Sequence, residues 1–445
     1  MAKKQLTIEE KLQAALVPVE EQPYKVPENW CWSYLENVCQ IIMGQSPKGA
    51  DTTLDDSYTP LIGGAADLGD TAPIINKYTK SVTKLSQCGD LIICIRATLG
   101  RPVVADGEYC LGRGVAGFRS SQIDVSFLRF FFINFERYLY DNATGSTFAQ
   151  VTSKVLGKMP IPLPPFLEQY RIVARIESLF AKLDEAKEKI QEVLDGADLR
   201  RAAILHQAFT GKLTEKWRRE NGVSGAGWQD VYIEDIAQVK GGKRVPKGMS
   251  LTDENTGHPY IKAGNLKQGT VISDNIMFVP DDVLPYIKNY TVNVGDVYIT
   301  NVGACIGDCG VIPVEFDGAN LTENAVKLTE LECDSYYLAK YISSDFVQID
   351  IKTRIASATL GKLSIANIKK IKVKLPTLSE QKEIVRLLDN LLSREQSTVT
   401  ACEEALTTID TLKKSILARA FRGELGTNDP AEPSAQGLLQ EILEA

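Results

Sequence analysis

The 445-residue chain lacks the residues and motifs on which most enzymatic chemistry depends. It has two histidines, His206 and His258, and neither lies near a suitable Cys or Ser in sequence. It has no GxxxxGK(S/T) phosphate-binding loop, no GxGxxG turn after a strand, and no Asn-Pro-Pro-Tyr or Asn-Pro-Pro-Phe run of the kind with which adenine methyltransferases hold a flipped base. We therefore expect no catalytic residue on this chain, and no cofactor or metal bound by it.

Long apolar runs and paired cysteines are also missing. No stretch of about 18 apolar residues occurs, so we expect no membrane span, and the charged start of the chain is unlike a secretory signal. The nine cysteines are odd in number and include no CxxC pair. Cys305 and Cys309 come nearest to metal-ligand spacing, but the pattern favours buried, reduced thiols over a zinc site and hence a cytoplasmic protein.

Excess positive charge is absent too. The net charge of −7 argues against a protein that binds nucleic acid over its whole surface, although local basic strips remain compatible with it. The composition, 44% hydrophobic and 24% charged, is ordinary for a globular protein, and the length allows two to four domains.

What the chain does contain is a long-range repeat. Residues 163–213 and 375–425 align without a gap at an offset of 212, with 16 of 51 positions identical. The identities include Pro164/Pro376, Glu168/Glu380 and Gln169/Gln381. Two copies of one unit imply a pseudo-two-fold molecule, which suits a two-part target such as duplex DNA.

The repeat extends into the regions before each helical segment, where Trp30 matches Trp228 and Gly89-Asp90 matches Gly295-Asp296. Short β-rich runs alternate there with turn residues, and each region has one aromatic helical stretch. The predicted fold is α/β (α+β), with two tandem pseudo-symmetric mixed α/β domains separated by long helices that form an antiparallel coiled coil. The predicted boundaries are an N-terminal helical segment 1–22, domain 23–165, helix 166–216, domain 217–377, helix 378–425, and a linker with C-terminal helix 426–445.

The long helices are predicted from an apolar a/d seam. In the first helix the seam comprises Ile172, Ile176, Leu179, Leu183, Ala186, Ile190, Val193 and Ala197. The second helix keeps Ile384, Leu388, Leu391, Ile409, Leu412 and Ile416, but has Glu395 and Thr398 in the middle of its seam. Mutual antiparallel pairing is the simplest way to bury both seams; the alternative is that each helix packs on its own domain.

Two further patterns have competing interpretations. The aromatic run 127–141 could stack bases, but its helical spacing favours a face buried against a sheet. The two Gly-Asp pairs could be carboxylate sites, but their position before apolar runs favours turns. At the ends of the chain, Thr7 and Glu10 have capping-box spacing before a short amphipathic helix. Residues 428–437 resemble a polar, Pro-rich linker, and the apolar face of the final helix could dock a partner or the N-terminal segment.

Basic and amide side chains gather in loops at equivalent points of the two repeats. Arg and Lys neutralise phosphates and read guanine, while Asn and Gln read adenine. The alternative is solvated surface loops, which the repetition makes less attractive. The candidates for DNA binding are Gln45, Lys48, Arg96, Arg101, Arg113, Lys240, Lys243, Arg244, Lys247, Asn265 and Asn301.

This arrangement resembles the specificity (S) subunit of type I restriction–modification systems over nearly the whole chain. The resemblance rests on the Leu-Pro and Glu-Gln pairs at the start of each long helical segment, and on "AFTGKL" (208–213) with its copy "AFRGEL" (420–425). The junction "GSTFAQVTSKVLGKMPIPLPP" (145–165) also looks like that of the family, although the second copy has Ala358 where the first has Ser146.

The resemblance implies a non-catalytic subunit that binds double-stranded DNA, one half of a bipartite asymmetric site per domain. It also implies two modification (methyltransferase) subunits, which would carry S-adenosylmethionine, and restriction (motor–nuclease) subunits as partners. The helices would set the spacer, each turn being worth about 5.4 Å. The alternatives are a related bipartite system with a fused restriction–modification partner, a single-chain restriction enzyme, and a coiled-coil scaffold without a DNA role.

Overall fold

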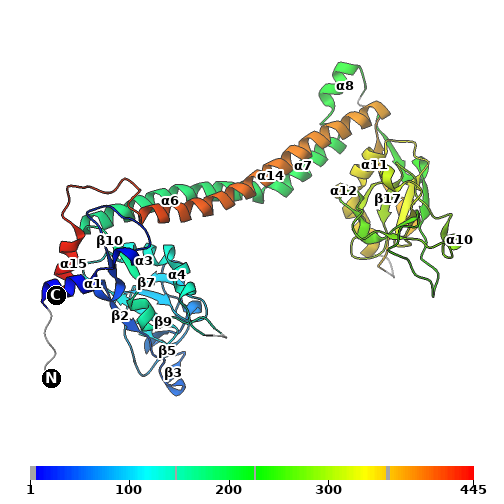
Figure 1. The fold of residues 1–445 in the computed structure, drawn as a ribbon. Coiled ribbons are helices and arrows are strands. Elements are labelled where there is room, and N and C mark those ends of the chain that lie inside the picture. Colours follow the sequence, from blue (N-terminus) through cyan, green and yellow to red (C-terminus); the bar gives the residue numbers. More distant parts are fainter. Residues whose placement is uncertain (1–6, 146–147, 225–226, 357–360, 445) are drawn as a thin grey trace. The chain divides into compact units, whose positions relative to one another are not determined.

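The computed structural model describes residues 7–145, 148–224, 227–356 and 361–444. The chain divides into two compact units (Figure 1). Unit 1 contains residues 1–190 and 404–445, and unit 2 contains residues 191–403. Each unit therefore holds one α/β domain, the first part of the long helix that follows that domain, and the last part of the other long helix.

In unit 1 the main sheet is antiparallel and four-stranded. Its order is β2 (Gln40–Met43), β9 (Val115–Arg119), β6 (Leu91–Cys94), β7 (Gly100–Val104). A second sheet has the order β3 (Thr52–Thr53), β5 (Tyr78–Thr79), β4 (Thr59–Ile62), β8 (Cys110–Leu111), and β4 pairs with β8 in parallel. A two-stranded ladder, β1 (Cys31–Tyr34) with β10 (Pro160–Leu163), joins the two ends of the domain just before the long helix.

Unit 2 repeats this topology. Its main sheet has the order β12 (Gln238–Gly241), β20 (Ala325–Thr329), β17 (Val297–Thr300), β18 (Cys309–Val311). The ladder that leads to the long helix pairs β11 (Gln229–Tyr232) with β21 (Lys372–Leu375). A further sheet has the order β16 (Met277–Phe278), β13 (Pro259–Ile261), β19 (Asn320–Leu321), and its β13–β19 pair is parallel like β4–β8; β14 (Leu266–Lys267) and β15 (Thr270–Val271) form a hairpin.

The helices follow the same duplication. Those wholly or mostly in unit 1 are α1 (Ile8–Ala15), α2 (Leu35–Val38), α3 (Val125–Asn134), α4 (Glu136–Asp141), α5 (Ser153–Gly157), α6 (Phe166–Asp195) and α15 (Ala435–Glu444). Those of unit 2 are α7 (Ala197–Phe209), α8 (Glu215–Asn221), α9 (Ile233–Ile236), α10 (Leu284–Ile287), α11 (Ser335–Ile342), α12 (Asp345–Ala356), α13 (Ile365–Lys369) and most of α14 (Leu378–Ala420). The first long helix is thus interrupted at Gly196, between α6 and α7.

The aromatic run forms α3 and α4, and the phenylalanine rings of α3 belong to the core, whereas Tyr140 of α4 is 45% exposed. Phe127, Phe131 and Phe132 are fully buried against the main sheet. Phe127 and Phe131 also contact Phe421 at the end of α14, with ring centroids 5.2 and 5.9 Å apart. Burial of these rings confirms the packing interpretation, because a buried ring cannot stack on a base.

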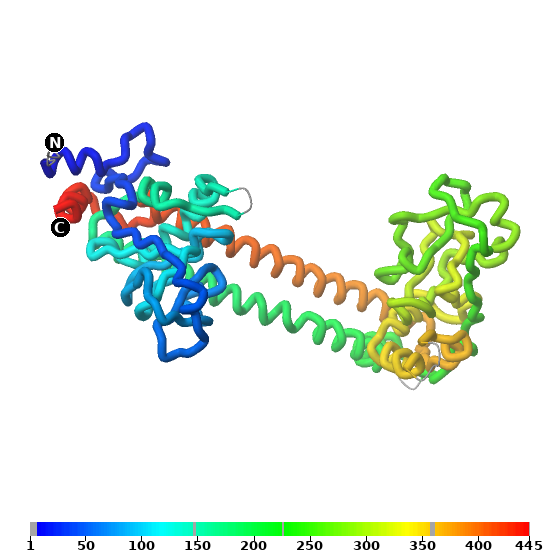
Figure 2. The backbone as a smooth tube through the Cα atoms, turned by 90° about the horizontal axis from the view of Figure 1, so that it is seen from below, coloured from blue at the N-terminus to red at the C-terminus, as the bar shows by residue number. Residues whose placement is uncertain are grey.

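The two long helices contact each other with opposite directions in both units. In unit 1, Ile172 and Ile176 of α6 share a core with Leu417 and Ala420 of α14, and both helices run side by side in Figures 1 and 2. In unit 2, Arg200 of α7 donates to Glu395 of α14 from Nε (3.0 Å) and Nη2 (2.8 Å). The Glu395 interruption of the predicted seam is therefore compensated by a cation on the facing helix.

Two predicted seam residues do not lie on the seam. Val193 is 37% exposed and Leu412 is 45% exposed, whereas Ile409 and Leu417 are buried. At Leu412 the packed face moves one position along the helix, to Lys413. The Lys413 ammonium pairs with Asp184 and lies 5.1 Å from the centre of the Phe180 ring. A strict heptad count misses this because an α-helix has 3.6 residues per turn and drifts from a 3.5-residue repeat.

The N- and C-terminal helices pack together in unit 1, as Figure 1 shows for α1 and α15. Thr7 and Glu10 form the predicted capping box. Leu439 of α15 is buried, and Leu12 and Leu16 pack against the same core. The final helix thus docks on the chain's own N-terminal segment, one of the two outcomes expected.

Candidate nucleic-acid interface

In both units, the loop after the edge strand of the main sheet (β2 or β12) packs against the start of the adjacent strand (β9 or β20). The amide of Gly44, after β2, donates to the Val115 carbonyl (3.0 Å), and that of Gly242, after β12, donates to the Ala325 carbonyl (3.1 Å). A Cβ at Gly44 would lie 2.1 Å from the Gly112 carbonyl oxygen, and one at Gly242 would lie 2.0 Å from that of Thr322. Only glycine fits this crossing, so both loops are held against the turn that precedes β9 or β20.

In unit 1 this loop carries Gln45 and Lys48, both exposed. The Gln45 amide donates to the Leu111 carbonyl (2.8 Å), and the Arg113 amide donates to Ser46 Oγ (3.2 Å). The side chain of Arg113 is exposed on the turn before β9. The structure therefore places Gln45, Lys48 and Arg113 on two loops that are bonded to each other.

Arg96 lies on the loop after β6, and Arg101 is the second residue of β7, at the other end of that loop. Arg101 has a φ of +52° and its Nη1 donates to the Ala65 carbonyl (3.3 Å). Arg96 is exposed, and the amide of its neighbour Ile95 donates to the Gly114 carbonyl (2.8 Å), on the turn that carries Arg113. All five predicted residues of unit 1 thus lie at one end of the main sheet, four on loops and Arg101 at the start of β7.

In unit 2 the corresponding loop carries Lys243, Arg244 and Lys247, all exposed. The Lys243 amide donates to the Leu321 carbonyl (2.9 Å), and its ammonium lies 5.5 Å from the centre of the Tyr290 ring. Arg244 pairs through Nε with the carboxylate of Glu323, on the turn before β20. Lys243, Arg244 and Glu323 thus occupy the positions of Gln45, Ser46 and Arg113 in unit 1.

The electrostatics of the Arg244–Glu323 pair favour the charged carboxylate. Partial burial raises the pKa of Glu323, but hydrogen bonds from Arg244 and from Thr322 Oγ1 (3.2 Å) outweigh it and leave the pKa below its ordinary value. A carboxylate that stays ionised keeps its partner oriented at all physiological pH values.

Three candidates of unit 2 lie outside this loop. Lys240 belongs to β12 and pairs with Glu330 (3.3 Å), which follows the far end of β20. Asn265 is 4% exposed; its Oδ1 accepts from the Lys262 amide and its Nδ2 donates to the carbonyls of Ile272 and Asp274. These hydrogen bonds hold the loop of Asn265 together. Its side chain is therefore buried and already bonded, unlike those of the exposed candidates.

Asn301 is half-buried at the end of β17. Its amide donates to the Asn324 carbonyl (2.9 Å), on the turn that carries Glu323. Its Oδ1 has no hydrogen-bond partner among the residues that the structure describes. Asn301 therefore adjoins the loop of Arg244, although its amide side chain is far less accessible than the cations.

The Gly-Asp pairs form turns with a further role. Asp90 is buried and accepts from Arg119 Nε (2.8 Å) and Nη2 (2.7 Å). Asp296 is buried and pairs with Lys327 (3.2 Å). Each ion pair links the turn before β6 or β17 to the neighbouring strand β9 or β20, which gives both carboxylates a structural role.

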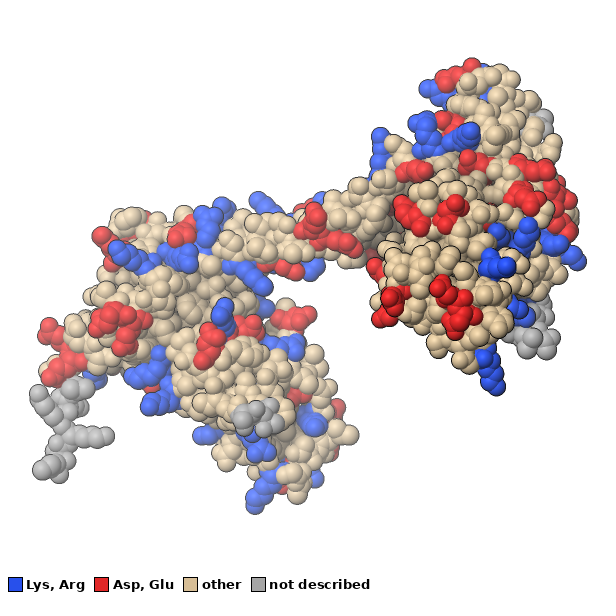
Figure 3. Space-filling view, turned by 45° about the vertical axis from the view of Figure 1, so that its right-hand side comes forward, with Lys and Arg blue, Asp and Glu red and all other residues tan. Residues whose placement is uncertain are grey.

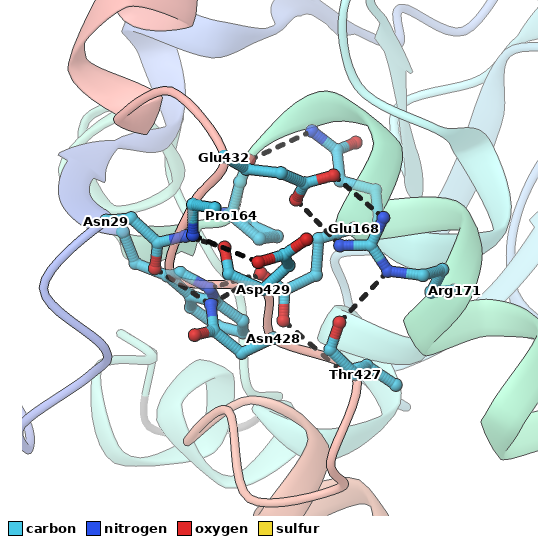
Figure 4. Close-up of polar contacts among 11 residues, drawn as sticks. Asn29, Pro164, Glu168, Arg171, Thr427, Asn428, Asp429 and Glu432 are labelled. Atoms are coloured by element: carbon cyan, nitrogen blue, oxygen red, sulfur yellow. Dashed lines mark hydrogen bonds and ion pairs between the residues drawn. The ribbon is translucent and has the colours of Figure 1, made fainter.

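Sequence reasoning missed the junction between each domain and its long helix. Glu168, one of the identities shared by the two repeats, is a fully buried acceptor. It accepts from Trp30 Nε1 (2.7 Å), Asn428 Nδ2 (2.9 Å) and Thr427 Oγ1 (3.3 Å). Figure 4 shows this cluster with the neighbouring pair of Arg171 and Glu432. The predicted linker 428–437 is therefore a segment bound to the start of α6.

Unit 2 builds the same junction around Glu380. This buried carboxylate accepts from Trp228 Nε1 (3.1 Å), Thr214 Oγ1 (2.6 Å) and Arg218 Nη1 (2.5 Å). The signal in the sequence was that the same Trp and Glu residues recur in both repeats, which is the pattern expected of two residues that contact each other in each copy.

The glutamine after each of these carboxylates fastens a domain helix. Gln169 Oε1 accepts from the Asp124 amide (2.9 Å), and Asp124 caps α3. Gln381 Oε1 accepts from the Asp334 amide (2.7 Å), and Asp334 caps α11. The repeated Glu-Gln pair thus couples the start of each long helix to two parts of its domain.

The described surface carries no large region of one charge in the face drawn in Figure 3, where basic and acidic side chains are interspersed on each unit. Within the described ranges, no group of three or more His, Cys, Asp and Glu could hold a metal ion. In the same ranges, no helix has both the length and the apolar character needed to cross a membrane. The Ser146/Ala358 difference lies outside the described residues.

Comparison with known proteins gives two tandem matches to one family model. The model for the type I restriction modification DNA specificity domain matches residues 27–195 and 226–404. The chain is 25% identical to the type I restriction enzyme EcoKI specificity subunit of Escherichia coli K12, over 94% of this chain and 96% of that protein. It is 32% identical to the putative type I restriction enzyme MjaX specificity subunit of Methanocaldococcus jannaschii, over 43% of this chain and 45% of that protein.

Solved structures show the same fold. The crystal structure of the HsdS subunit from Thermoanaerobacter tengcongensis matches with a TM-score of 0.66 and 21% sequence identity, over 91% of this chain and all of that one. A chain from a structural study of complex assembly and conformational transition in a type I restriction–modification system also has a TM-score of 0.66, at 20% identity.

Proposed function

This chain belongs to the family of type I restriction modification DNA specificity domains, and from that premise we propose that it is the DNA-recognition subunit of a type I restriction–modification complex. Each α/β domain reads one half of a bipartite asymmetric site in double-stranded DNA. The subunit itself catalyses nothing. Two modification subunits, which bind S-adenosylmethionine, and restriction subunits supply the chemistry.

The observation that carries the proposal is the duplicated loop arrangement. In each unit a glycine crossing holds a polar loop against the turn before the second strand of the main sheet. Unit 1 presents Gln45, Lys48 and Arg113 there, with Arg96 and Arg101 at the same end of the sheet; unit 2 presents Lys243, Arg244 and Lys247. The same backbone with different side chains suits a protein that reads two different half-sites, because specificity comes from side-chain contacts to base edges.

Among the other candidates, Lys240 serves better as a phosphate contact than as a base reader, since it is exposed but already paired with Glu330. Asn265 supports its loop. Asn301 lies beside the Arg244 loop and would reach DNA only after its turn opens. The acidic net charge is compatible with DNA binding because basic groups concentrate at these loops.

The long helices act as the spacer between half-sites and as the platform for the modification subunits. We propose that α6, α7 and α14 form an antiparallel coiled coil, supported by the Arg200–Glu395 and Asp184–Lys413 contacts of opposite-running helices. A related bipartite system, in which one partner polypeptide both cleaves and methylates, uses the same subunit design and is the second candidate.

The test is to co-express the chain with its modification subunit and to map methylated adenine across a genome. A bipartite motif with a fixed gap is the expected result. If a complex that forms and binds S-adenosylmethionine methylates no site, the recognition role is wrong and a scaffold without a DNA role remains. Alanine variants of Gln45 and Lys48 serve as a half-site control, because they should change one half of the motif only.

The spacer role has its own test in matched deletions. Removing residues 183–189 from α6 and 407–413 from α14 takes one heptad from each helix, and the Asp184–Lys413 pair shows that these stretches face each other. Seven residues amount to about 10.5 Å, or about three base pairs, and rotate the helix by only about 20°. The gap in the motif should shorten accordingly; an unchanged gap would refute the spacer role.

A further inference from the structure

The turn before the second strand of the main sheet differs in charge between the two units. In unit 2 it carries Glu323, and the facing loop carries Arg244. In unit 1 the turn carries Arg113, and the facing loop carries Ser46, whose Oγ accepts from the Arg113 amide. The cation is therefore on the loop in one unit and on the turn in the other.

The geometry of the unit 2 pair leaves the arginine ready to bind a base. Glu323 engages Arg244 through Nε alone. Within the described residues the Arg244 side chain makes no other hydrogen bond or ion pair, so both terminal NH2 groups remain available. The Arg244 side chain is 77% exposed, whereas Glu323 is 28% exposed and is bonded to Thr322 Oγ1.

An arginine in this state matches the acceptor pair of guanine. The O6 and N7 atoms of guanine accept two parallel hydrogen bonds from a guanidinium in the major groove. Holding the Nε edge fixes the plane of the guanidinium and reduces the side-chain entropy that an exposed arginine would lose on binding. The carboxylate also repels phosphates, which discourages Arg244 from binding the DNA backbone instead.

We propose that Glu323 is a positioning residue that holds Arg244 to read one guanine in the half-site of unit 2. The inference rests on the proposed function and assigns a specificity role that unit 1 does not share, because Arg113 has no carboxylate partner in the described part of unit 1. Arg244 supplies the base contact, and Glu323 acts through Arg244.

The experiment maps the methylation motif of the complex with the modification subunit for the wild type, Arg244→Ala and Glu323→Gln. Arg244→Ala should reduce discrimination at one G·C pair of one half-site by about 5- to 100-fold. Glu323→Gln preserves size but removes the charge, and should relax discrimination at the same pair. The gap and the other half-site should not change.

The matched control is Glu330→Gln, which removes a carboxylate that pairs with Lys240 at the other end of β20 and should leave the motif intact. A second variant, Arg244→Ser with Glu323→Arg, gives unit 2 the charge arrangement of unit 1 and should change the preferred base at that position.

The outcomes separate the two proposals. Absence of any bipartite motif in the wild type overturns both. A wild-type bipartite motif that stays unchanged in Arg244→Ala and Glu323→Gln overturns this inference alone. A motif relaxed by Arg244→Ala but not by Glu323→Gln shows that Arg244 reads the base without positioning by Glu323, and also overturns it.

Discussion

The two units share a junction in which a tryptophan donates to a buried glutamate at the start of a long helix, but the other donors to that carboxylate differ. Glu380 of unit 2 has a cation, Arg218, whose side chain is 14% exposed, among its donors. Among the described residues, the donors to Glu168 of unit 1 are neutral groups of Trp30, Thr427 and Asn428, while Arg171 pairs with Glu432 alongside. The comparison shows that the repeat preserves the acceptor at the helix start, whereas the segment that follows the other long helix supplies the remaining donors.

The recognition loops differ more than the junctions do. Their glycine crossings coincide, but their charges are distributed differently, with Arg113 on the turn of unit 1 and Glu323 on that of unit 2. A buried junction tolerates few changes because each buried polar group needs its partner. Exposed loop side chains carry no such restriction, and this is where two half-sites can be read differently.

Removing the buried carboxylates should break the comparison with the largest effect. Glu380→Ala leaves Arg218 buried without its counter-charge and should destabilise unit 2 by about 3–5 kcal/mol. Glu168→Ala leaves neutral donors unpaired and should destabilise unit 1 by about 1–3 kcal/mol. Hydrogen exchange measured by mass spectrometry reports each unit separately. Equal losses in the two units would contradict the assigned difference.

The glutamine contacts should give a smaller and more even effect. Gln169→Ala and Gln381→Ala each remove the acceptor of a helix-capping residue's amide, Asp124 or Asp334, and should each cost about 1–2 kcal/mol. Faster exchange should be confined to α3 in one variant and to α11 in the other. A loss that spreads equally through both units would show that the glutamines do not act locally.

The ion pairs between the long helices should contribute less again. Arg200→Ala removes the pair with Glu395, and Lys413→Ala removes the pair with Asp184. Both pairs are partly solvated, so each variant should lower the thermal midpoint only slightly, and the decrease should shrink at high salt. A salt-independent decrease would indicate lost packing, of Lys413 on Phe180 for example, in place of lost charge.

Thiol labelling sharpens the comparison without perturbing either fold. Burial raises the pKa of Cys39 in unit 1 and of Cys309 in unit 2 from 9.0 to about 12, so the reactive thiolate is about a thousandfold scarcer at neutral pH. Cys88 and Cys305 are exposed. We expect maleimide to label these two first, one in each unit. Rapid labelling of Cys39 or Cys309 below the unfolding transition would mean that the surrounding core opens.

The duplication, the strand runs and the helix starts could be predicted because they depend on local patterns. The β6 and β17 strands follow their Gly-Asp turns, and α14 begins at Leu378, two residues after the proline of the Leu-Pro pair. Exposed candidates such as Lys48, Arg113 and Arg244 also lie where loop chemistry suggests. The sequence pattern did not predict that the Asn265 amide forms hydrogen bonds within its own loop, or that Leu412 lies off the packed face.

The sequence by itself determined that the molecule contains two copies of one α/β unit and a helix, because hydrophobic periodicity and repeated motifs are local properties. Only the tertiary structure decided which residues meet. It bound the Thr427–Glu432 segment to the start of α6, buried Glu168 and Glu380 under tryptophans, and set Glu323 beside Arg244. Such pairings join residues up to 261 positions apart, and a buried charge or a shared hydrogen bond selects its partner only when the folded chain brings the two together.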